Sequence, residues 1–394
     1  MIRIATFTTL YPNAVQPTHG VFVENRLRRL VASGLVTSRV VAPVPWFPPA
    51  FVPLFGSYAP LARVPREERR FDLAVFHPRF PVLPKVGMAV APALLFAWSL
   101  PALRRLQAES GDFDLIDAHY FYPDGVAAVM LGKMLRKPVV ITARGTDINL
   151  IARYALPRAM IRYAASKAAG IIAVSQALKD GLTALGVPPA HIRVLRNGVD
   201  LSIFRPKDRA VARERLGVGG PMLLSVGNLV ELKGHDLVID SLRSLPQYSL
   251  LICGEGPGRL ELERLAKQFG VSGRVRFLGR IPHEQLAEIY SAADALVLAS
   301  SREGWPNVLL EAMACGTPVI ASEMGGIPEV VTRPEAGVLM AERTAGGVAA
   351  AVKQLFQSLP DRAVTRRYAE RFSWDETTRG QIQLFEAILA GSPS

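Results

Sequence analysis

Short apolar runs alternate with stretches of helical hydrophobic periodicity from one end of the chain to the other. In the first half, apolar runs predict buried strands at residues 2–8, 38–43, 114–118, 138–142 and 171–174. The intervening stretches predict helices at residues 20–33, 86–109, 124–135 and 157–169. Alternation of this kind is typical of a parallel sheet that helices cover on both faces.

The second half repeats this alternation. Its predicted strands are residues 222–226, 248–253, 275–278, 295–298 and 318–321. Its predicted helices are residues 235–244, 257–269, 283–291, 306–314 and 345–357. The pattern therefore predicts an α/β fold with two Rossmann-like domains. We expect the first domain to span residues 1–199 and the second residues 200–374, with a last helix at 375–390 that packs back on the first domain.

Two segments depart from the alternation. Residues 43–60 are rich in proline and aromatic residues and predict an irregular loop, because closely spaced prolines break both ladders and helices. Residues 86–103 form the most apolar window, but Pro92 and Pro101 interrupt it, so we do not expect it to span a membrane. This window predicts either a core helix or a helix that lies on a membrane surface. The basic residues that flank it are Lys85, Arg104 and Arg105.

Composition supports a globular protein with a sizeable core, since 49% of the residues are hydrophobic and 20% are charged. The net charge of +12 is unevenly distributed. Residues 1–200 hold 24 basic and 12 acidic side chains, whereas the remaining residues hold 22 of each. This excess favours an anionic partner for the first half, such as a membrane surface, an acidic polymer, nucleic acid or a lipid diphosphate. A charge that only aids solubility is the alternative.

Cysteine usage and the N-terminus bear on the compartment. Cys253 and Cys315 lie among apolar neighbours and predict buried, reduced thiols rather than a disulfide or a metal site. The chain begins directly with a predicted strand, so no signal peptide is expected. We therefore expect a cytoplasmic protein, with a peripheral location at the inner face of the plasma membrane as the alternative.

The loops that follow the strands of the second half hold the candidate chemistry, because ligands of open parallel sheets bind at the carboxyl ends of the strands. In residues 225–234, Gly227 permits a tight turn and Lys233 precedes a glycine and a helix. A lysine at a helix start suits a diphosphate, since its ammonium group adds charge to the free backbone amides. A surface lysine is the alternative.

Two further loops are weaker candidates. Gly254 and Gly256 follow a strand, but their GxGxG spacing can equally be a tight turn that exposes Glu255. Arg280 and Ile281 lie after the next strand, where backbone groups can meet a nucleobase. For the following His283 we expect a role in capping the next helix.

The strongest segment is 300–322. Glu303 lies in a loop before the helix that begins near Pro306, and Glu311 lies inside that helix. Residues eight apart on one helix point about 80° apart, so a shared site requires Glu303 to lie on the loop. The amides of Asn307 and Val308 can hold a phosphate at the positive end of the helix. Glu311 can accept two ribose hydroxyls and Glu303 can bind sugar hydroxyls, with a structural glutamate as the alternative.

These residues resemble a known family. The motifs that carry the resemblance in the second half are SREGWPNVLLEAMACGTPVIASEMGGIPEVV (301–331), VGNLVELKG (226–234), GEGPGRLELE (254–263) and VLRNGVDLSIFRP (194–206). In the first half they are THGVFVENRLRRL (18–30), DLIDAHYFYPDG (114–125), ITARGTDI (141–148) and VSQALKDGL (174–182). Together they are similar to the retaining glycosyltransferases of family 4, which have the GT-B fold of two Rossmann-like domains facing across a cleft.

The resemblance implies roles for single residues. Lys233 would stabilise the leaving diphosphate, Glu311 would bind the ribose and Glu303 the donor sugar. His119 matches the histidine near the reacting centre, and the loop at Gly20 would approach the donor phosphates. The family generally needs no divalent metal or other cofactor, and none is expected here: the six histidines are spread widely and no DxD occupies a plausible loop after a strand.

Two departures from the family pattern concern the phosphates. Asn228 stands where the family often has arginine, and Arg144 stands where a histidine is common. Arg144, with the nearby Asp147, is therefore our candidate for a phosphate or acceptor contact. Cationic residues of the first half and the apolar segments 46–55 and 86–100 suggest a lipid-linked or carbohydrate acceptor beside an anionic membrane. The cationic residues are Arg26, Arg28, Arg29, Arg63, Arg66, Arg69, Arg70, Lys133, Arg136 and Lys137.

Other functions remain as alternatives. A sugar-nucleotide epimerase of the same fold would bind the same donor without an acceptor. A basic nucleic-acid-binding protein would leave Glu303 and Glu311 unexplained, and no recognition motif supports it, so nucleic acid is not an expected partner. A nicotinamide-dependent oxidoreductase is excluded, because the first strand leads into TLYPNAVQPTHG and lacks the glycine fingerprint.

Overall fold

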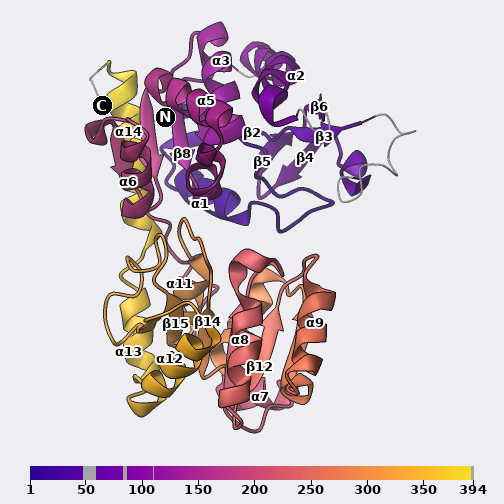
Figure 1. The fold of residues 1–394 in the computed structure, drawn as a ribbon. Helices are drawn as coiled ribbons and strands as arrows, with labels where there is room; N and C mark the ends of the chain where they lie inside the picture. The colour runs from indigo at the N-terminus through magenta and orange to yellow at the C-terminus, as the bar shows by residue number, and fades with distance from the viewer. Residues whose placement is uncertain (48–58, 83–86, 110, 392–394) are drawn as a thin grey trace. The chain divides into compact units, whose positions relative to one another are not determined.

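The computed structural model describes residues 1–47, 59–82, 87–109 and 111–391. The chain divides into two compact units. Unit 1 comprises Met1–Arg196 and Asp375–Ser394, and unit 2 comprises Asn197–Trp374. Both units are α/β and are built on parallel sheets, which confirms the predicted fold class (Figure 1).

Unit 1 contains an eight-stranded sheet in the spatial order β10-β9-β8-β7-β1-β2-β5-β4. The strands are β1 (Ile2–Phe7), β2 (Val36–Val41), β4 (Glu67–Arg70), β5 (Leu73–Phe76), β7 (Leu115–His119), β8 (Val139–Ala143), β9 (Gly170–Ala173) and β10 (Ile192–Val194). All neighbours pair in parallel except β4, which is antiparallel to β5. The central strands β7 and β8 are buried along their whole length, as expected for strands covered on both faces.

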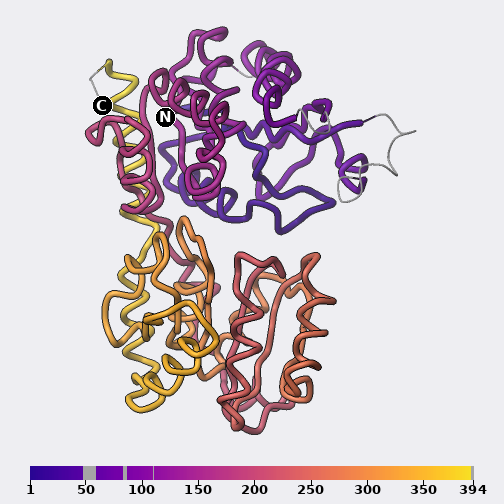
Figure 2. Tube along the Cα trace, viewed as in Figure 1, coloured from indigo at the N-terminus to yellow at the C-terminus, as the bar shows by residue number. Residues whose placement is uncertain are grey.

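Helices cover both faces of this sheet. They are α1 (Val21–Ala32), α2 (Gly87–Glu109), α3 (Val126–Leu135), α4 (Thr146–Asn149), α5 (Ala155–Lys167), α6 (Gln176–Ala184) and α14 (Trp374–Leu389). Side chains of α1 and α14 share one core cluster with Ile4, Leu115 and Val140 of the sheet. The tube in Figure 2 shows how the yellow C-terminal segment returns to unit 1, where Leu384 and Ile388 pack on Gly170.

Unit 2 contains a six-stranded parallel sheet in the spatial order β13-β12-β11-β14-β15-β16. The strands are β11 (Met222–Val226), β12 (Ser249–Cys253), β13 (Val275–Gly279), β14 (Ala295–Leu298), β15 (Val319–Ser322) and β16 (Gly337–Met340). The helices are α7 (Arg209–Leu216), α8 (His235–Ser241), α9 (Arg259–Gln268), α10 (Leu286–Ala292), α11 (Asn307–Ala314), α12 (Ala345–Gln357) and α13 (Arg362–Ala369). Cys253 and Cys315 are buried free thiols.

Both sheets reverse their strand order at one point. In unit 2 the chain runs outward from β11 through β12 to β13, then returns to β14 on the other side of β11. Unit 1 does the same between β1 and β7. Loops diverge at such a switch point, which leaves a crevice at the carboxyl ends of the two strands. The fold therefore directs attention to the loops after β1 and β7, and to those after β11 and β14.

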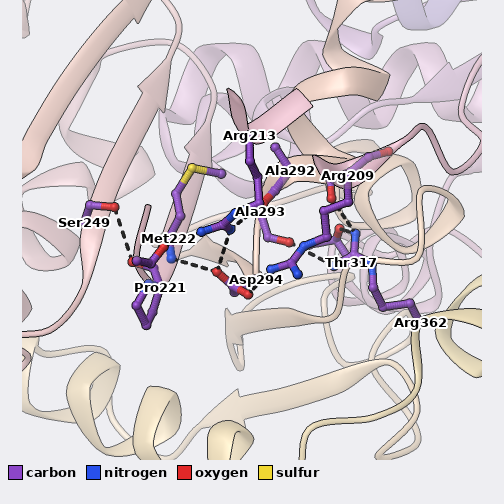
Figure 3. Close-up of polar contacts among 12 residues, drawn as sticks. Arg209, Arg213, Pro221, Met222, Ser249, Ala292, Ala293, Asp294, Thr317 and Arg362 are labelled. Carbon is purple, nitrogen blue, oxygen red and sulfur yellow. Dashed lines mark hydrogen bonds and ion pairs between the residues drawn. The ribbon is translucent and has the colours of Figure 1, made fainter. Parts of the chain in front are cut away.

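Charged side chains also gather at the opposite, amino end of the unit 2 sheet (Figure 3). The Asp294 carboxylate pairs with Arg209 and Arg213 of α7 and accepts the backbone N–H of Met222 at 2.8 Å. Nearby, the Arg362 guanidinium donates to the carbonyl groups of residues 291 and 293 and to Thr317 Oγ1 at 2.7 Å. These hydrogen bonds and ion pairs attach α7 and α13 to the amino end of the unit 2 sheet.

Helix α2 forms where the sequence predicted a helix, at residues 86–109, but it is less buried than a core helix. It runs without a break for 23 residues through Pro92 and Pro101. Each proline removes one backbone hydrogen bond, but packing of one buried stripe holds the helix together. Only 22% of its most apolar window is buried, so the expectation of a core helix is wrong. By length and composition alone, α2 could cross a membrane, with a mean hydropathy of 1.3.

Other differences lie at the edges of the sheets. A small second sheet pairs β3 (Val44–Trp46) with β6 (Arg79–Pro81), so the predicted loop at 43–60 begins with a strand. Residues 48–58 of that loop, together with Lys85, lie outside the described residues. The sequence patterns also missed strands β4, β5, β10 and β16 and helices α6, α7 and α13. Arg26, expected on a cationic surface, is fully buried.

Candidate functional site

Lys233 and Glu303 meet at the switch point of the unit 2 sheet. Lys233 ends a short 3-10 turn in the loop after β11, and Glu303 lies in the loop after β14. The Lys233 Nζ atom lies 2.6 Å from Glu303 Oε1. Both side chains stay partly open to solvent, at 22% and 12% exposure. The structure thus brings together a cation and a carboxylate that are seventy residues apart in the sequence.

Close backbone approach makes this meeting possible. Gly234 has a positive φ of 69°, and a Cβ atom there would collide with the carbonyl oxygen of Ala299. Only glycine therefore allows the two loops to lie against each other. Ser300, which follows Ala299, donates from Oγ to Glu303 Oε1 at 2.8 Å and fixes the carboxylate. Sequence reasoning missed Ser300; the signal was a polar residue directly after an apolar strand.

The glycines after β12 also allow two loops to pack closely, as Gly234 does. A Cβ atom at Gly254 would collide with the carbonyl oxygen of Gly227, and one at Gly256 with that of Leu229. The two loops therefore pack backbone against backbone, which supports the tight-turn interpretation of Gly254 and Gly256. Asn228 lies in the same loop, and its carbonyl group accepts a hydrogen bond from His235 Nε2 at 3.3 Å.

Glu311 has two partners inside unit 2. Its Oε1 atom lies 3.2 Å from His283 Nε2, and its Oε2 atom accepts from the Tyr290 hydroxyl at 2.9 Å. Burial lowers the pKa of His283, but the hydrogen bond and charge of Glu311 outweigh burial and raise it overall. The expected helix cap by His283 is wrong, because its ring contacts Glu311 and packs edge-on against Phe204 instead. Glu311 is thus held in place while 12% exposed.

Helix α11 begins beside this carboxylate. Asn307 is its first residue and Val308 its second, and Trp305 just before it donates from Nε1 to the Asn197 carbonyl at 2.9 Å. Asn197 also bonds the Asn307 side chain at 3.3 Å. Among the described residues, no side chain caps the first turn of α11. The Asn307 amide donates to the Trp305 carbonyl at 3.1 Å and the Leu309 amide to the Pro306 carbonyl at 3.0 Å, which leaves the Val308 amide available to an anion at the positive end of the helix.

Arg280 and Ile281 lie at the outer side of the same edge. The Arg280 guanidinium pairs with Glu255 at 2.9 Å, and both side chains are about half exposed. This pair joins the loops after β12 and β13. Contact of Arg280 and Ile281 with a nucleobase stays a prediction.

The switch point of unit 1 is organised by a buried aspartate. Asp124 accepts the Thr9 backbone N–H at 2.7 Å and the hydroxyl groups of Thr8 and Thr9. Burial raises the pKa of Asp124 to about 7 against these hydrogen bonds. Gly20 closes the same loop with a φ of 70°, and a Cβ atom there would collide with the Leu10 carbonyl. Asp124, which sequence reasoning missed, therefore shapes the loop predicted to approach the donor phosphates.

His119 is buried, and both of its ring nitrogens have partners. Its Nε2 atom lies 3.3 Å from Asp117 Oδ2, and its Nδ1 atom lies 2.7 Å from the Arg144 guanidinium. Burial lowers the pKa of His119 to about 4, and the charge of Arg144 acts in the same direction. Since arginine can only donate, Nδ1 accepts and the neutral ring carries its proton on Nε2. This geometry favours a positioning role over proton transfer by the ring.

Arg144 and Asp147, the two residues predicted to contact the acceptor, have different surroundings. The Arg144 guanidinium stacks over Phe22 at 5.3 Å and has its pKa lowered to about 9 by burial and by the charge of Arg26. Asp147 is fully buried and accepts backbone N–H groups from Phe121 at 2.8 Å and Gly145 at 2.7 Å. Asp147 therefore fixes the loop that carries Arg144. A direct acceptor contact by either residue stays a prediction.

The described part of the chain places no group of three or more His, Cys, Asp or Glu side chains to hold a metal ion. The polar groups at the two switch points are instead cations, carboxylates and helix-start amides. Such a set can hold a diphosphate and sugar hydroxyls.

Two Rossmann-like units with polar groups at their switch points are the architecture of the GT-B fold. A family model described as glycosyl transferases group 1 matches residues 206–372, and one described as glycosyltransferase family 4 matches residues 58–203. The chain belongs to the group 1 glycosyltransferases of the family 4 type, which confirms the resemblance read from the motifs.

Known relatives agree with this assignment. D-inositol 3-phosphate glycosyltransferase of Mycobacterium leprae is 36% identical over 214 residues, which are 51% of this chain and 50% of that protein. The chain therefore matches about half the length of these curated relatives. Sucrose-phosphate synthase from Thermosynechococcus elongatus has a TM-score of 0.78 at 23% identity over 100% of both chains. Anabaena HepE in complex with UDP has a TM-score of 0.72 at 19% identity over 98% of this chain and 100% of that chain. At such identities the two structures show the fold alone.

Proposed function

We propose that the protein transfers a sugar from a nucleoside-diphosphate sugar, bound by unit 2, to an acceptor bound by unit 1. The observation that carries this proposal is the meeting of Lys233 and Glu303 at the switch point of the unit 2 sheet, 2.6 Å apart. One group suits a diphosphate and the other suits sugar hydroxyls, and they are adjacent as the two halves of a nucleotide sugar are.

The leaving nucleoside diphosphate develops negative charge as the glycosidic bond breaks. In our proposal that charge is stabilised by Lys233 and the open amide of Val308 without a metal ion. The Asn307 amide can join them only by leaving the Trp305 carbonyl, to which it donates at 3.1 Å. Such fixed donors are worth about 3–4 kcal/mol each in the transition state. We assign retention of configuration by similarity to the family and name no covalent nucleophile.

The partners of Glu311 support its proposed contact with the ribose. His283 and Tyr290 hold the carboxylate from the protein side. A carboxylate has about four acceptor positions, so two remain for ribose hydroxyls. Without such partners a flexible glutamate would lose more rotamer entropy when it binds the ligand.

We further propose a carbohydrate or lipid-linked acceptor and attachment to the inner face of the plasma membrane. The support is the outer face of α2, where Ala93 and Ala97 are exposed and Arg104 and Arg105 follow at one end. An apolar face beside cations suits an anionic bilayer surface. The relatives named for inositol phosphate suggest a polar, phosphate-bearing acceptor as a first test.

The donor proposal is tested by thermal unfolding with UDP, GDP, ADP, TDP and their common sugar conjugates. A nucleotide at about 100 times its dissociation constant adds about 2.7 kcal/mol to the free energy of unfolding. We expect a shift with one nucleotide and its loss in Glu311→Ala. The matched control is Glu261→Ala, which removes an exposed carboxylate of α9. No shift with any nucleotide would refute the donor site.

Product analysis then separates transfer from epimerisation. A transferase releases the nucleoside diphosphate only when an acceptor is present, whereas an epimerase releases none. Flotation with anionic vesicles at low salt tests the membrane proposal. We expect the double variant Ala93→Glu/Ala97→Glu to abolish flotation and the control Ala159→Glu, on an exposed position of α5, to retain it. A native protein that stays in the soluble fraction would contradict this proposal.

A further inference from the structure

Unit 1 contains a pocket of about 560 Å³ that lies apart from the strand of His119. Its walls are β3, the start of β4, the loop from β5 to β6, and α2. β5 runs parallel to β2 and ends at Phe76, so the pocket is at the carboxyl side of the sheet. Its volume falls in the range typical of small-molecule sites.

The strand order sets the distance to the proposed reacting centre. From β7, which ends at His119, the sheet passes through β1 and β2 to β5. Three strand spacings amount to about 14 Å. A ligand in this pocket therefore lies about two or three sugar units away from His119 along the same edge of the sheet.

Two tryptophans give the pocket an unusual wall. Trp46 of β3 is 39% exposed and Trp98 of α2 is 47% exposed, and Phe76 adds a third aromatic ring. Tryptophan has a large apolar face and a polar edge, and in a folded protein it is seldom left this open without a partner. The flat faces of such rings suit the C–H face of a sugar ring.

The charges of the pocket do not balance. Of its three arginines, Arg105 pairs with Glu67 at 2.6 Å. Among the described residues, the bonds that Arg79 donates go to backbone carbonyls, at 3.2 Å to Ala62 and 2.5 Å to Val64. Burial lowers the pKa of Arg79, and the charge of Arg66 lowers it further, so the two guanidinium groups repel each other.

Arg66 is exposed and has no carboxylate partner among the residues that the structure describes. With Arg105 neutralised by Glu67, Arg66 and Arg79 leave two positive charges at the pocket wall. A phosphate monoester carries between one and two negative charges at neutral pH and offers acceptor oxygens to several guanidinium donors.

We propose that this pocket binds a sugar phosphate, with the ring against Trp46 and Trp98 and the phosphate on Arg66 and Arg79. For its place in the reaction the inference rests on the proposed function: the sugar phosphate is a distal unit of the acceptor. Binding itself requires no turnover. The ligand has two sources, a soluble phosphorylated glycan or the headgroup of a lipid, and both present a hydroxylated ring joined to an anionic phosphate, which is a monoester in the first and a singly charged diester in the second.

Calorimetric titration of the full chain tests the proposal, with tryptophan fluorescence as a second readout. The probes are glucose 6-phosphate, glucose and inorganic phosphate. We expect saturable binding of glucose 6-phosphate that is at least about 10-fold tighter than that of either fragment. Arg66→Gln should weaken it at least about 10-fold, as the loss of a hydrogen bond between charged groups does. The control Arg69→Gln removes an arginine of β4 that is 75% exposed and should leave binding unchanged.

Trp98→Ala tests the ring contact separately. It should weaken glucose 6-phosphate but not inorganic phosphate, and Tyr163→Ala, at an exposed position of α5, is its control. Absence of saturable binding, equal binding of inorganic phosphate, or binding that survives both Arg66→Gln and Trp98→Ala would overturn the proposal. Failure here beside a nucleotide shift that depends on Glu311 would remove this pocket alone and leave the proposed function standing.

Vesicles distinguish the two sources. If the ligand is a lipid headgroup, vesicles with phosphatidylinositol should bind more tightly than vesicles of equal charge made with phosphatidylglycerol, and Arg66→Gln should abolish the difference. Equal binding to both vesicles, beside tight glucose 6-phosphate binding, would assign the pocket to a soluble phosphorylated glycan.

Discussion

The two ends of the unit 2 sheet carry similar charged side chains in different states. At the amino end, the Asp294 carboxylate is 14% exposed and is shared by three donors, which are Arg209, Arg213 and a backbone N–H group. At the carboxyl end, Lys233 and Glu303 form a single pair that stays partly exposed. The amino end has more cations than carboxylates, and its additional guanidinium groups donate to backbone carbonyls. The carboxyl end has an ion pair that is partly exposed and the open amide of Val308 at the start of α11.

This difference separates charges that hold the fold from charges that can serve a ligand. Strands β11 and β14, which run between the two ends, are buried throughout, so charged groups are confined to the ends. At the amino end three donors share the Asp294 carboxylate, so its removal leaves all three without this acceptor. Groups at the carboxyl end keep unused hydrogen-bonding capacity. We therefore expect substitutions at the amino end to affect stability and those at the carboxyl end to affect binding.

The largest expected effect is that of Asp294→Ala on stability. Removal of this carboxylate leaves Arg209, Arg213 and the Met222 amide without their shared acceptor. Three donors lose a hydrogen bond to a charged group, at about 1.5 kcal/mol each where solvent reaches part of the site, so we expect a loss of about 3–5 kcal/mol. Chemical denaturation followed by circular dichroism measures the change. The control Arg215→Gln breaks an exposed pair with Glu288 and should cost less than about 1 kcal/mol. Equal losses in the two variants would contradict the distinction between the two ends.

Lys233→Ala should have the next largest effect, but on catalysis. Loss of one preorganised charge near the leaving group lowers the rate by about 100- to 1,000-fold. Stability should change by less than about 1 kcal/mol, because the Lys233–Glu303 pair is partly solvated and Ser300 still holds Glu303. Initial rates and denaturation midpoints of the same preparation provide the two readouts. A stability loss as large as that of Asp294→Ala would show that this end is also structural.

Much of the fold followed from periodicity. Strands β7, β8, β11 and β14 are mostly apolar, and the sequence predicted them within about two residues because strands buried on both faces have few polar positions. Strands at the edge of a sheet were not predicted, because they lack such apolar runs. β4 has the sequence EERR, which no hydrophobic pattern marks as a strand, and only pairing with β5 makes it one. Helix α2 crosses two prolines because tertiary packing outweighs their local cost.

The candidate site could be predicted from the sequence less completely than the fold. Lys233 and Glu303 stood out because charged residues directly after apolar runs mark the carboxyl ends of strands. Their contact depends on Gly234, whose close approach to Ala299 is a tertiary fact. Asp117 and Gln381 show a second limit. Gln381 of α14 bonds Asp117 at 3.0 Å, which in turn contacts His119, and a partner 264 residues away leaves no local signal.

Glu311→Gln tests the carboxyl end with a smaller expected effect. If the carboxylate accepts ribose hydroxyls, the native protein should prefer the ribonucleotide over its 2′-deoxy analogue by about 1.5–3 kcal/mol. The variant should lose most of this preference, because it keeps only one acceptor oxygen. Calorimetric titration with both nucleotides in both proteins gives the coupling. A preference that survives the substitution would place the ribose contact elsewhere.

The smallest expected effect is that of His235 on the pH dependence of stability, for which the direction of the change can be predicted. It lies at the carboxyl end between Ser225 and the Asn228 carbonyl, and burial lowers its pKa to about 4. The unfolded chain takes up this proton near pH 6.5, so stability is fully present above that value and is lost as the pH falls toward 4. At pH 5 the loss should be about 2 kcal/mol.

His235→Gln removes this one titration, so the melting temperature of the variant should fall less steeply between pH 6.5 and 5 than that of the native protein. His119 of unit 1 has the same lowered pKa and remains in the variant, so part of the slope should persist. The test rests on the slope because the substitution itself changes stability at every pH. An unchanged slope would mean that the proton enters His235 in the folded state. Water would then reach the His235 ring in the folded protein. The carboxyl end would therefore differ from the amino end in its buried residues as well as in the partly exposed Lys233–Glu303 pair.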